Sequence, residues 1–274
     1  MTRNHHPTHH HPQVRPAAWC FPGLLVLTVL GSLIPAGDRA ADAQIIYCKV
    51  AVDEETPTAP EVYRERLSAR LDAASRIFNQ YCQVKFVPIE FTTWDSDDRV
   101  HDLERSVREF ELEVSPGRAQ VAIGFSSQYK FQAGRHGMGG TRGPMYSHIF
   151  LKDDAPNVFE LDKLEVLVHE LGHYLGAAHT TDQDSAMRPV LGDGKPRVAS
   201  FRIGFDPINA RIVNLMGREI RDRHIRSLGQ VSRMTLLDLR TEYAKLAALE
   251  RNDETAKRYL GFIDRCLRQN PSRP

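Results

Sequence analysis

The chain has 274 residues, of which 41% are hydrophobic and 26% are charged. This composition suits a globular protein with a buried core and excludes a disordered chain. The 36 basic and 35 acidic side chains give a formal net charge of +1, so neither sign is in excess to attract a polyanion. We therefore expect no nucleic-acid partner and no binding to an anionic membrane surface.

Residues 1–43 have the pattern of a secretory signal peptide. Basic residues and a histidine tract precede an apolar stretch from about Ala17 to Ala36, and Ala41-Asp42-Ala43 then offers a small-x-small cleavage site. We expect cleavage there, which makes the mature protein secreted, periplasmic or otherwise extracytoplasmic. The alternative is an uncleaved membrane anchor, because about 18 apolar residues can just span a bilayer.

Three cysteines follow this segment: Cys48, Cys82 and Cys266. Export permits disulfide bonds. Cys48 and Cys82 are expected on neighbouring strands, which makes them the favoured pair. Buried, reduced thiols are the alternative that the sequence leaves open.

The first half of the mature chain alternates strand and helix patterns. β-Branched and apolar runs predict strands at residues 44–52, 83–91, 119–125 and 145–151. Apolar residues spaced three and four apart predict two helices, one from Glu61 and one over 100–114 that Asp97 or Asp98 can cap. The glycine-rich segment 134–143 is expected to be a loop. This order favours a mixed α/β fold, with the first two helices on one face of the sheet.

The helix expected at residues 161–175 is apolar nearly all round, which places it inside the protein. Polar residues within such a helix are therefore informative. His169 and His173 are four residues apart, hence one turn apart on one face, where both rings can bind one ion. Glu170 follows the first histidine and can reach a water beside the ion, which is the position of a general base.

A third histidine completes this pattern. Gly176 can end the helix and turn the chain sharply, so that His179 swings back as a ligand. Three imidazoles plus water form an open, catalytic Zn²⁺ site, whereas a structural site has a fourth protein ligand. The alternative, a buried helix with unrelated histidines, would bury several polar groups without a common partner. The sequence predicts Zn²⁺ on His169, His173 and His179, with Glu170 catalytic.

The segment HELGHYLGAAH, from His169 to His179, resembles the zinc-binding consensus HExxHxxGxxH of the metzincin metallopeptidases. Ser185-Ala186-Met187-Arg188-Pro189 is similar to the Met-turn of that family, which implies that Met187 lies beneath the zinc as an apolar floor. No tyrosine lies two residues after Met187, and Thr180 follows the third histidine. Both features make the chain somewhat matrixin-like.

The resemblance implies a metzincin-like catalytic domain over residues 44–219, with a twisted mixed sheet, an active-site helix and a Met-turn. It also implies that Met145–Leu151 is the edge strand that pairs antiparallel with a bound peptide, and that residues 190–194 wall the pocket. Two amphipathic helices then predict a C-terminal helical extension, 220–274, that packs against the catalytic domain. Asp253 can cap the second of these helices.

The sequence thus predicts a secreted zinc-dependent metalloendopeptidase, in which a zinc-activated water hydrolyses peptide bonds of a protein or peptide substrate. One alternative is an exported zinc-containing binding protein, an inactive homologue that acts through its cleft or its C-terminal helices. Another is a tethered interaction module that acts through residues 220–274. An intact Glu170 argues against the inactive homologue.

Overall fold

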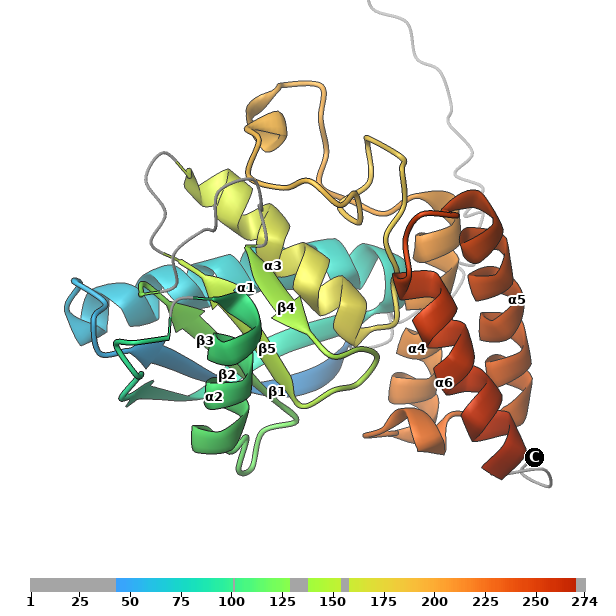
Figure 1. Cartoon of the computed structure of the whole chain (residues 1–274), viewed down its shortest axis with the longest axis horizontal. Helices are drawn as coiled ribbons and strands as arrows, with labels where there is room; N and C mark the ends of the chain where they lie inside the picture. Colours follow the sequence, from blue (N-terminus) through green and yellow to red (C-terminus); the bar gives the residue numbers. More distant parts are fainter. Residues whose placement is uncertain (1–42, 101, 129–137, 154–157, 270–274) are drawn as a thin grey trace, which may run out of the picture. The chain divides into compact units, whose positions relative to one another are not determined.

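A five-stranded mixed sheet, in the strand order β2-β1-β3-β5-β4, organises the computed structural model (Figure 1). The structure describes residues 43–100, 102–128, 138–153 and 158–269, so the expected signal segment and residues 134–137 of the glycine-rich segment lie outside the described residues. In the described part of the chain, no helix is both long enough and apolar enough to cross a bilayer.

Four strands of the sheet are parallel: β1 (Gln44–Asp53), β2 (Val84–Trp94), β3 (Val121–Ser126) and β5 (His148–Lys152). The short β4 (Gly139–Thr141) runs antiparallel to β5 at one edge. Strands β3 and β5 are buried along their whole length, which explains why they read as continuous apolar runs. At the other edge, the β1–β2 register shifts beside Pro88, because proline cannot donate to the ladder.

The first two helices lie on opposite faces of the sheet, so the expectation of one shared face is wrong. Helix α1 (Pro60–Cys82) packs on the face that carries Ile46 and Val50, whereas Phe110 of α2 (Leu103–Glu113) packs against Ala51 on the other. The strand order gives the reason. The chain moves from β1 to β2 in one direction and from β2 past β1 to β3 in the other, and right-handed crossovers of opposite direction lie on opposite faces.

Two local expectations are also corrected. Helix α2 starts later than expected, because Asp102 rather than Asp97 or Asp98 accepts a hydrogen bond from the Arg105 backbone N–H (3.0 Å). The favoured disulfide does not form: Cys48 lies on β1, but Cys82 is the last residue of α1 rather than part of a strand. Each buried thiol instead donates to a nearby backbone carbonyl.

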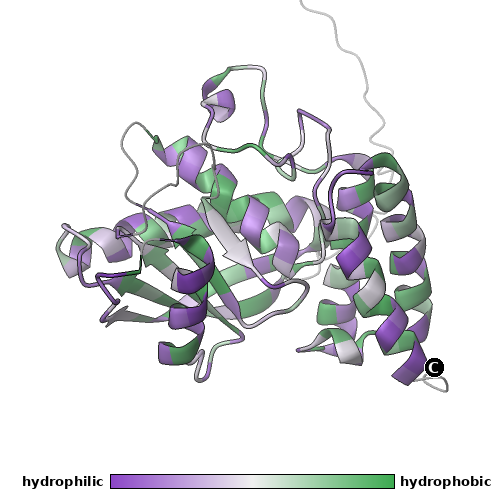
Figure 2. Cartoon of the chain, viewed as in Figure 1, coloured by the Kyte–Doolittle hydropathy of each residue, from purple (hydrophilic) through white to green (hydrophobic). Residues whose placement is uncertain are grey.

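Helix α3 (Glu160–Tyr174) lies on the same face as α1 and is buried over most of its length. A loop with the short 3₁₀ helix η1 (Lys195–Arg197) leads from it to α4 (Pro207–Arg223). The side chain of Asp206 caps α4 by accepting from the N–H groups of Ile208 and Asn209. Figure 2 shows hydrophobic residues gathered on the strands and on the helix sides that face one another.

The last elements are η2 (Leu228–Gln230), α5 (Arg233–Leu249) and α6 (Thr255–Gln269). Helices α5 and α6 pack together beside α4, and their buried residues belong to the same hydrophobic core as those of α3 (Figure 1). Contacts join the described residues from 43 to 269 into one compact unit. The boundary between residues 219 and 220 stays a prediction.

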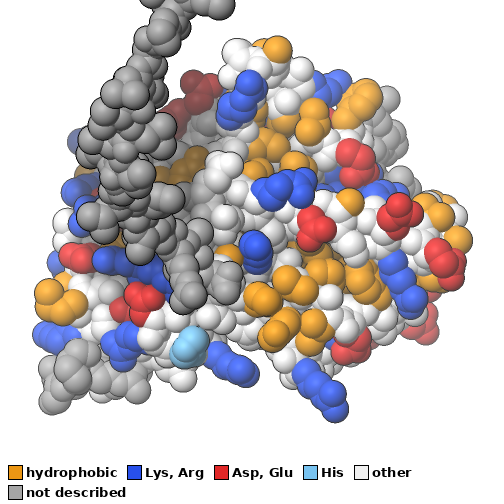
Figure 3. Space-filling view, turned by 180° about the vertical axis from the view of Figure 1, so that it is seen from behind, with side chains coloured by type: hydrophobic (Ala, Val, Ile, Leu, Met, Phe, Trp, Pro, Cys, Tyr) orange, Lys and Arg blue, Asp and Glu red, His pale blue; other side chains and the backbone are white. Residues whose placement is uncertain are grey.

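The surface carries both signs of charge. Figure 3 shows one face of the molecule, on which basic and acidic side chains are interspersed with hydrophobic ones. This distribution agrees with the formal net charge of +1.

Candidate active site

The structure brings the three predicted histidines together. His169 and His173 lie one turn apart on α3, and the turn after the helix returns His179 to them. The Nε2 atom of His173 is 3.0 Å from Nε2 of His169 and 3.2 Å from Nε2 of His179. One ring nitrogen of each histidine therefore points to a common centre, and the three ligand atoms lie within 4.8 Å of one another.

Gly176 makes the return of the chain possible. Its φ of +91° lies in the left-handed region, which a glycine adopts without strain. A Cβ at this position would also lie 2.8 Å from the Tyr243 hydroxyl. The N–H of Ala177 donates to the carbonyl of Gly172 (2.8 Å) and closes the helix end. Asn209 of α4 then fixes Ala178 through paired hydrogen bonds with its backbone (2.8 and 2.9 Å).

The hydrogen bonds at the far side of each ring fix which nitrogen carries the proton. Nδ1 of His169 donates to the carbonyl of Ala186, and Nδ1 of His173 donates to the carbonyl of Ala177 (both 2.8 Å). A carbonyl oxygen only accepts, so each Nδ1 carries the hydrogen and each Nε2 carries a lone pair. Lone pairs about 3 Å apart repel unless a cation lies between them, so this donor set fits a metal ion.

Burial keeps two of the rings neutral. It lowers the pKa of His169 to about 3 and the pKa of His173 well below its ordinary value. The neighbouring imidazoles add to both shifts. Neutral imidazole is the form that binds a metal, and three imidazoles are the donor set of open, catalytic zinc sites.

Glu170 lies beside these rings with its carboxyl group inside the protein. The residue is 4% exposed, and its Oε2 has no hydrogen-bond partner in the part of the chain that the structure describes. Burial raises the pKa of the Glu170 carboxyl to about 8. A buried oxygen without a partner is costly, so its presence beside a pocket is typical of a group that acts on a bound molecule.

The histidines and Glu170 open into a pocket of about 220 Å³. It is lined by Met138, Gly139, Gly140, Thr141, His169, Glu170, His173, His179, Pro189, Leu191, Thr255 and Arg258. Leu191 comes from the segment 190–194 that was expected to wall the pocket.

The edge strand beside this pocket is β4, so the expectation that Met145–Leu151 forms the edge is wrong. Strand β5 in that region lies between β3 and β4 and is paired on both sides. Strand β4 was missed because its three residues, GGT, carry no apolar alternation. Its backbone hydrogen bonds to β5 define it instead.

The Met-turn lies under the histidines. Met187 is fully buried, and its Sδ would be 2.8 Å from a Cβ added to Gly172 of α3. The turn also supplies the carbonyl of Ala186 that holds His169. The N–H of Thr180 donates to the carbonyl of Met187 (3.1 Å), so the turn and the segment after the third histidine are tied together.

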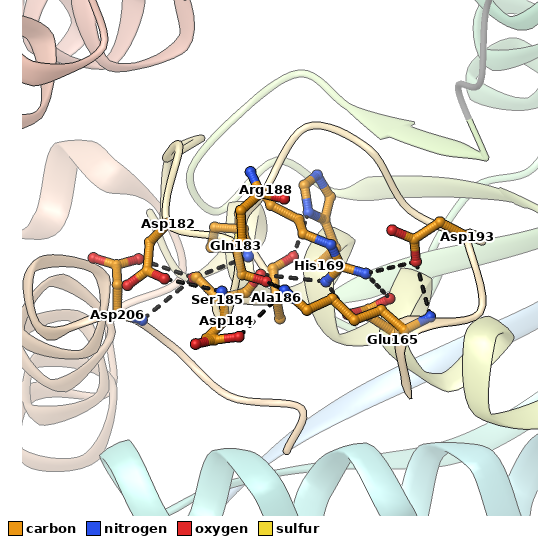
Figure 4. Close-up of polar contacts among 12 residues, drawn as sticks. Glu165, His169, Asp182, Gln183, Asp184, Ser185, Ala186, Arg188, Asp193 and Asp206 are labelled. Carbon is orange, nitrogen blue, oxygen red and sulfur yellow. Dashed lines mark hydrogen bonds and ion pairs between the residues drawn. The ribbon is translucent and has the colours of Figure 1, made fainter. Parts of the chain in front are cut away.

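A buried ion pair supports the same turn. Figure 4 shows Arg188 beside Glu165 of α3 and Asp193. The guanidinium group donates to both carboxylates, with 3.0 Å to Asp193, and the side chains of Arg188 and Glu165 are 1% and 0% exposed. Paired charges of this kind tolerate burial because each satisfies the other. They join the Met-turn to the helix that carries the site.

The C-terminal helices contribute to the site in a way that the sequence did not reveal. Asp253 and Thr255 contact the ring of His179, and Tyr259 Oη lies 3.4 Å from Nδ1 of His173. Arg258 lines the pocket. The only sequence signal was the polar residue before a predicted helix, which identifies Asp253 as a cap but not as a neighbour of a histidine.

Comparison with known proteins identifies the family. The sequence model of the matrixins (peptidase M10) matches residues 58–210, which is more than half of the chain. Comparison with curated protein sequences gives no match.

Two solved structures are similar in part. A structure of a chaperone–substrate complex has 13% identity and a TM-score of 0.46, and the match covers 65% of this chain but only 35% of that one. Archaemetzincin from Methanopyrus kandleri has 18% identity and a TM-score of 0.43, with 69% of this chain and 99% of that one covered. The family match over residues 58–210 confirms the resemblance and the mixed α/β metzincin fold: this chain belongs to the matrixin family of metzincins.

Proposed function

We propose that this protein is an exported zinc endopeptidase that hydrolyses peptide bonds in a protein or peptide substrate. Its family is one of metallopeptidases. The observation that carries the proposal is the convergence of three imidazole Nε2 atoms beside the partnerless Glu170 carboxyl oxygen, in one pocket. A metal-binding triad without such a carboxyl group would support binding alone.

His169, His173 and His179 would hold the ion through Nε2. Bound zinc supplies Lewis acidity, which polarises a carbonyl group and lowers the pKa of water. A cation held by the three imidazoles would lower the raised pKa of Glu170 and favour its carboxylate form. As a carboxylate, Glu170 takes a proton from the attacking water and passes it to the leaving amine. A carboxylate does this from a position beside the ligands, and Glu170 has such a position because it neighbours His169 on α3.

The substrate would bind as an extended peptide along β4. This strand is the last in the described sheet, and Gly139–Thr141 line the pocket next to Glu170. Peptides add to a free strand edge through backbone hydrogen bonds, which gives affinity without dependence on sequence. The pocket side chains would then supply the preference for particular residues.

Export rests on the sequence of residues 1–43. N-terminal sequencing of the mature protein from its native host should find a chain that begins near Gln44. A mature protein that retains residues 1–43 in the membrane fraction would favour the anchor instead.

The test of the enzymatic proposal is the Glu170→Gln variant. Loss of the general base should lower the rate of cleavage of a fluorogenic peptide by about 10²–10⁴-fold, while zinc content after dialysis stays at the wild-type level. Glu104→Gln is the matched control, since the Glu104 side chain is 86% exposed on α2. A chelator should abolish wild-type cleavage. If the Glu170→Gln variant were fully active, Glu170 could not be the general base. If the zinc-loaded wild type bound peptides but did not cut them, the inactive homologue would be favoured.

A further inference from the structure

The third histidine is held differently from the other two. Nδ1 of His169 and of His173 each donate to a neutral backbone carbonyl. Nδ1 of His179 instead faces the carboxylate of Asp253, with 2.8 Å to Oδ2, and the hydroxyl of Thr255 at 3.1 Å. These two partners lie 74 and 76 residues further along the chain. Asp253 lies in the turn between α5 and α6, and Thr255 is the first residue of α6.

Asp253 is itself held in place. Its Oδ1 accepts from the backbone N–H of Thr255 (2.7 Å), so one oxygen caps α6 while the other faces His179. Its own N–H donates to the carbonyl of Glu250 (3.0 Å). The Asp253 side chain is 30% exposed.

A second carboxylate from the same turn fastens the adjacent backbone. Glu250, 7% exposed, accepts from the N–H of Thr181 (2.7 Å) and from the Thr181 hydroxyl (3.0 Å). The residues just after the third histidine are therefore bound to the α5–α6 turn at two points. Together these contacts fix both the position and the rotation of the His179 ring.

A carboxylate behind a ligating imidazole has two effects. It accepts the Nδ1 hydrogen, which leaves the lone pair on Nε2, and its negative charge makes that nitrogen a stronger donor to a cation. A neutral carbonyl also accepts the Nδ1 hydrogen, but without a full negative charge it strengthens Nε2 as a donor only weakly.

We propose that Asp253 is a positioning residue of the metal centre, and that the α5–α6 hairpin is part of the catalytic unit. The proposal rests on the proposed function only in that the three histidines bind a metal ion. It places a residue of the site 34 residues beyond the end of the segment 44–219, over which the sequence predicted a catalytic domain.

The experiment measures zinc affinity of the full mature chain by competition with a chromogenic chelator. Asp253→Ala should weaken zinc binding by about 10–100-fold, the effect of losing such an outer partner. Asp253→Asn keeps an acceptor for the Nδ1–H of His179 but loses the negative charge. Its zinc affinity should therefore lie between those of the wild type and Asp253→Ala. Glu254→Gln is the matched control, because the neighbouring Glu254 side chain is 79% exposed and pairs with Lys257.

Thermal unfolding of the metal-free variants separates positioning from a merely structural role. A structural role alone would lower the Tm of the metal-free protein and leave the zinc affinity of the folded protein unchanged. Wild-type affinity in folded Asp253→Asn and Asp253→Ala would overturn the proposal. If Asp253→Ala does not fold, Asp253→Asn decides alone. A wild type that binds zinc but cuts no peptide would refute the endopeptidase and leave this test intact.

Discussion

Gly139 shows how closely the edge strand approaches the proposed base. A Cβ at this position would lie 2.8 Å from Glu170 Oε1 and 2.9 Å from the carbonyl oxygen of Phe150. The second neighbour is backbone, which cannot turn aside as a flexible side chain can. Glycine is therefore required here for space, so that β4 can line the pocket beside the carboxyl group.

We expect Gly139→Ala to impair catalysis without loss of zinc. The added methyl group must displace Glu170 or move β4, and a shift of about 1 Å at a reacting group can cost on the order of 100-fold in rate. Gly140→Ala is the control, because the nearest atom to its Cβ is Val107 Cγ2 at 3.7 Å, an ordinary contact. Peptide cleavage and zinc content are measured for both variants. Equal cleavage rates would show that β4 can shift to accommodate the added methyl group without harm to catalysis.

At the scale of elements, a partly buried ion cluster joins α3 to α1 and to the end of β5. Arg70 of α1 donates from Nη1 to Asp153 (2.6 Å) and from Nη2 to Glu160 at the start of α3 (2.8 Å). Arg66 reaches the other oxygen of Asp153 (2.6 Å). The Arg70 and Asp153 side chains are only 4% and 9% exposed. Ion pairs with α1 thus hold the first turn of α3, the helix that carries His169 and His173.

This cluster makes stability depend on pH. Burial alone would raise the pKa of Asp153, but Arg70 and Lys163 outweigh it, and the net shift is downward. A lowered pKa in the folded state gives stability that is complete above the unfolded pKa, about 3.9, and is lost as pH falls through the folded value.

Asp153→Asn should therefore cost about 3 kcal/mol at pH 7, since it leaves buried Arg70 short of a charged partner. Its free energy of unfolding should also fall less than that of the wild type between pH 6 and pH 3. Urea unfolding at several pH values measures both effects. Asp72→Asn, at an exposed position on the same helix, serves as control. If the free energy of unfolding fell equally with pH in Asp153→Asn and the wild type, Asp153 would not be the source of this pH dependence.

At the scale of the whole molecule, one core joins the C-terminal helices to the helix that carries the histidines. Tyr243 of α5 is fully buried, and its hydroxyl donates to the carbonyl of Gly176 (2.6 Å) at the turn after α3. Its ring meets that of Tyr259 edge-on, with 5.7 Å between centroids. Helix α5 therefore supports the turn that brings His179 into the site.

Tyr243→Phe keeps the ring and removes the hydroxyl, which leaves the buried carbonyl of Gly176 without this donor. We expect a loss of about 1–3 kcal/mol in the free energy of unfolding. Denaturant unfolding measures it, with Tyr47→Phe as the control because that side chain is 44% exposed. An unchanged free energy in Tyr243→Phe would mean that solvent replaces the hydroxyl.

The sequence by itself determined the parts of the site that are close in the chain. Helical periodicity and a glycine three residues after His173 suffice to place His169, Glu170, His173 and His179 together. The resemblance of this segment to the metzincins, and the mixed fold that the alternating strand and helix patterns predicted, were confirmed. The roles of these residues as zinc ligands and base stay predictions.

Only the tertiary structure decided which distant segments meet. Strand β4 has no hydrophobic signature and is fixed by pairing with β5. Helices α1 and α2 occupy opposite faces of the sheet because of the strand order. Asp253 faces His179 across 74 residues because the packing of α5 and α6 on the common core brings their turn there. Side-chain patterns report local periodicity, whereas such contacts depend on how complete elements pack.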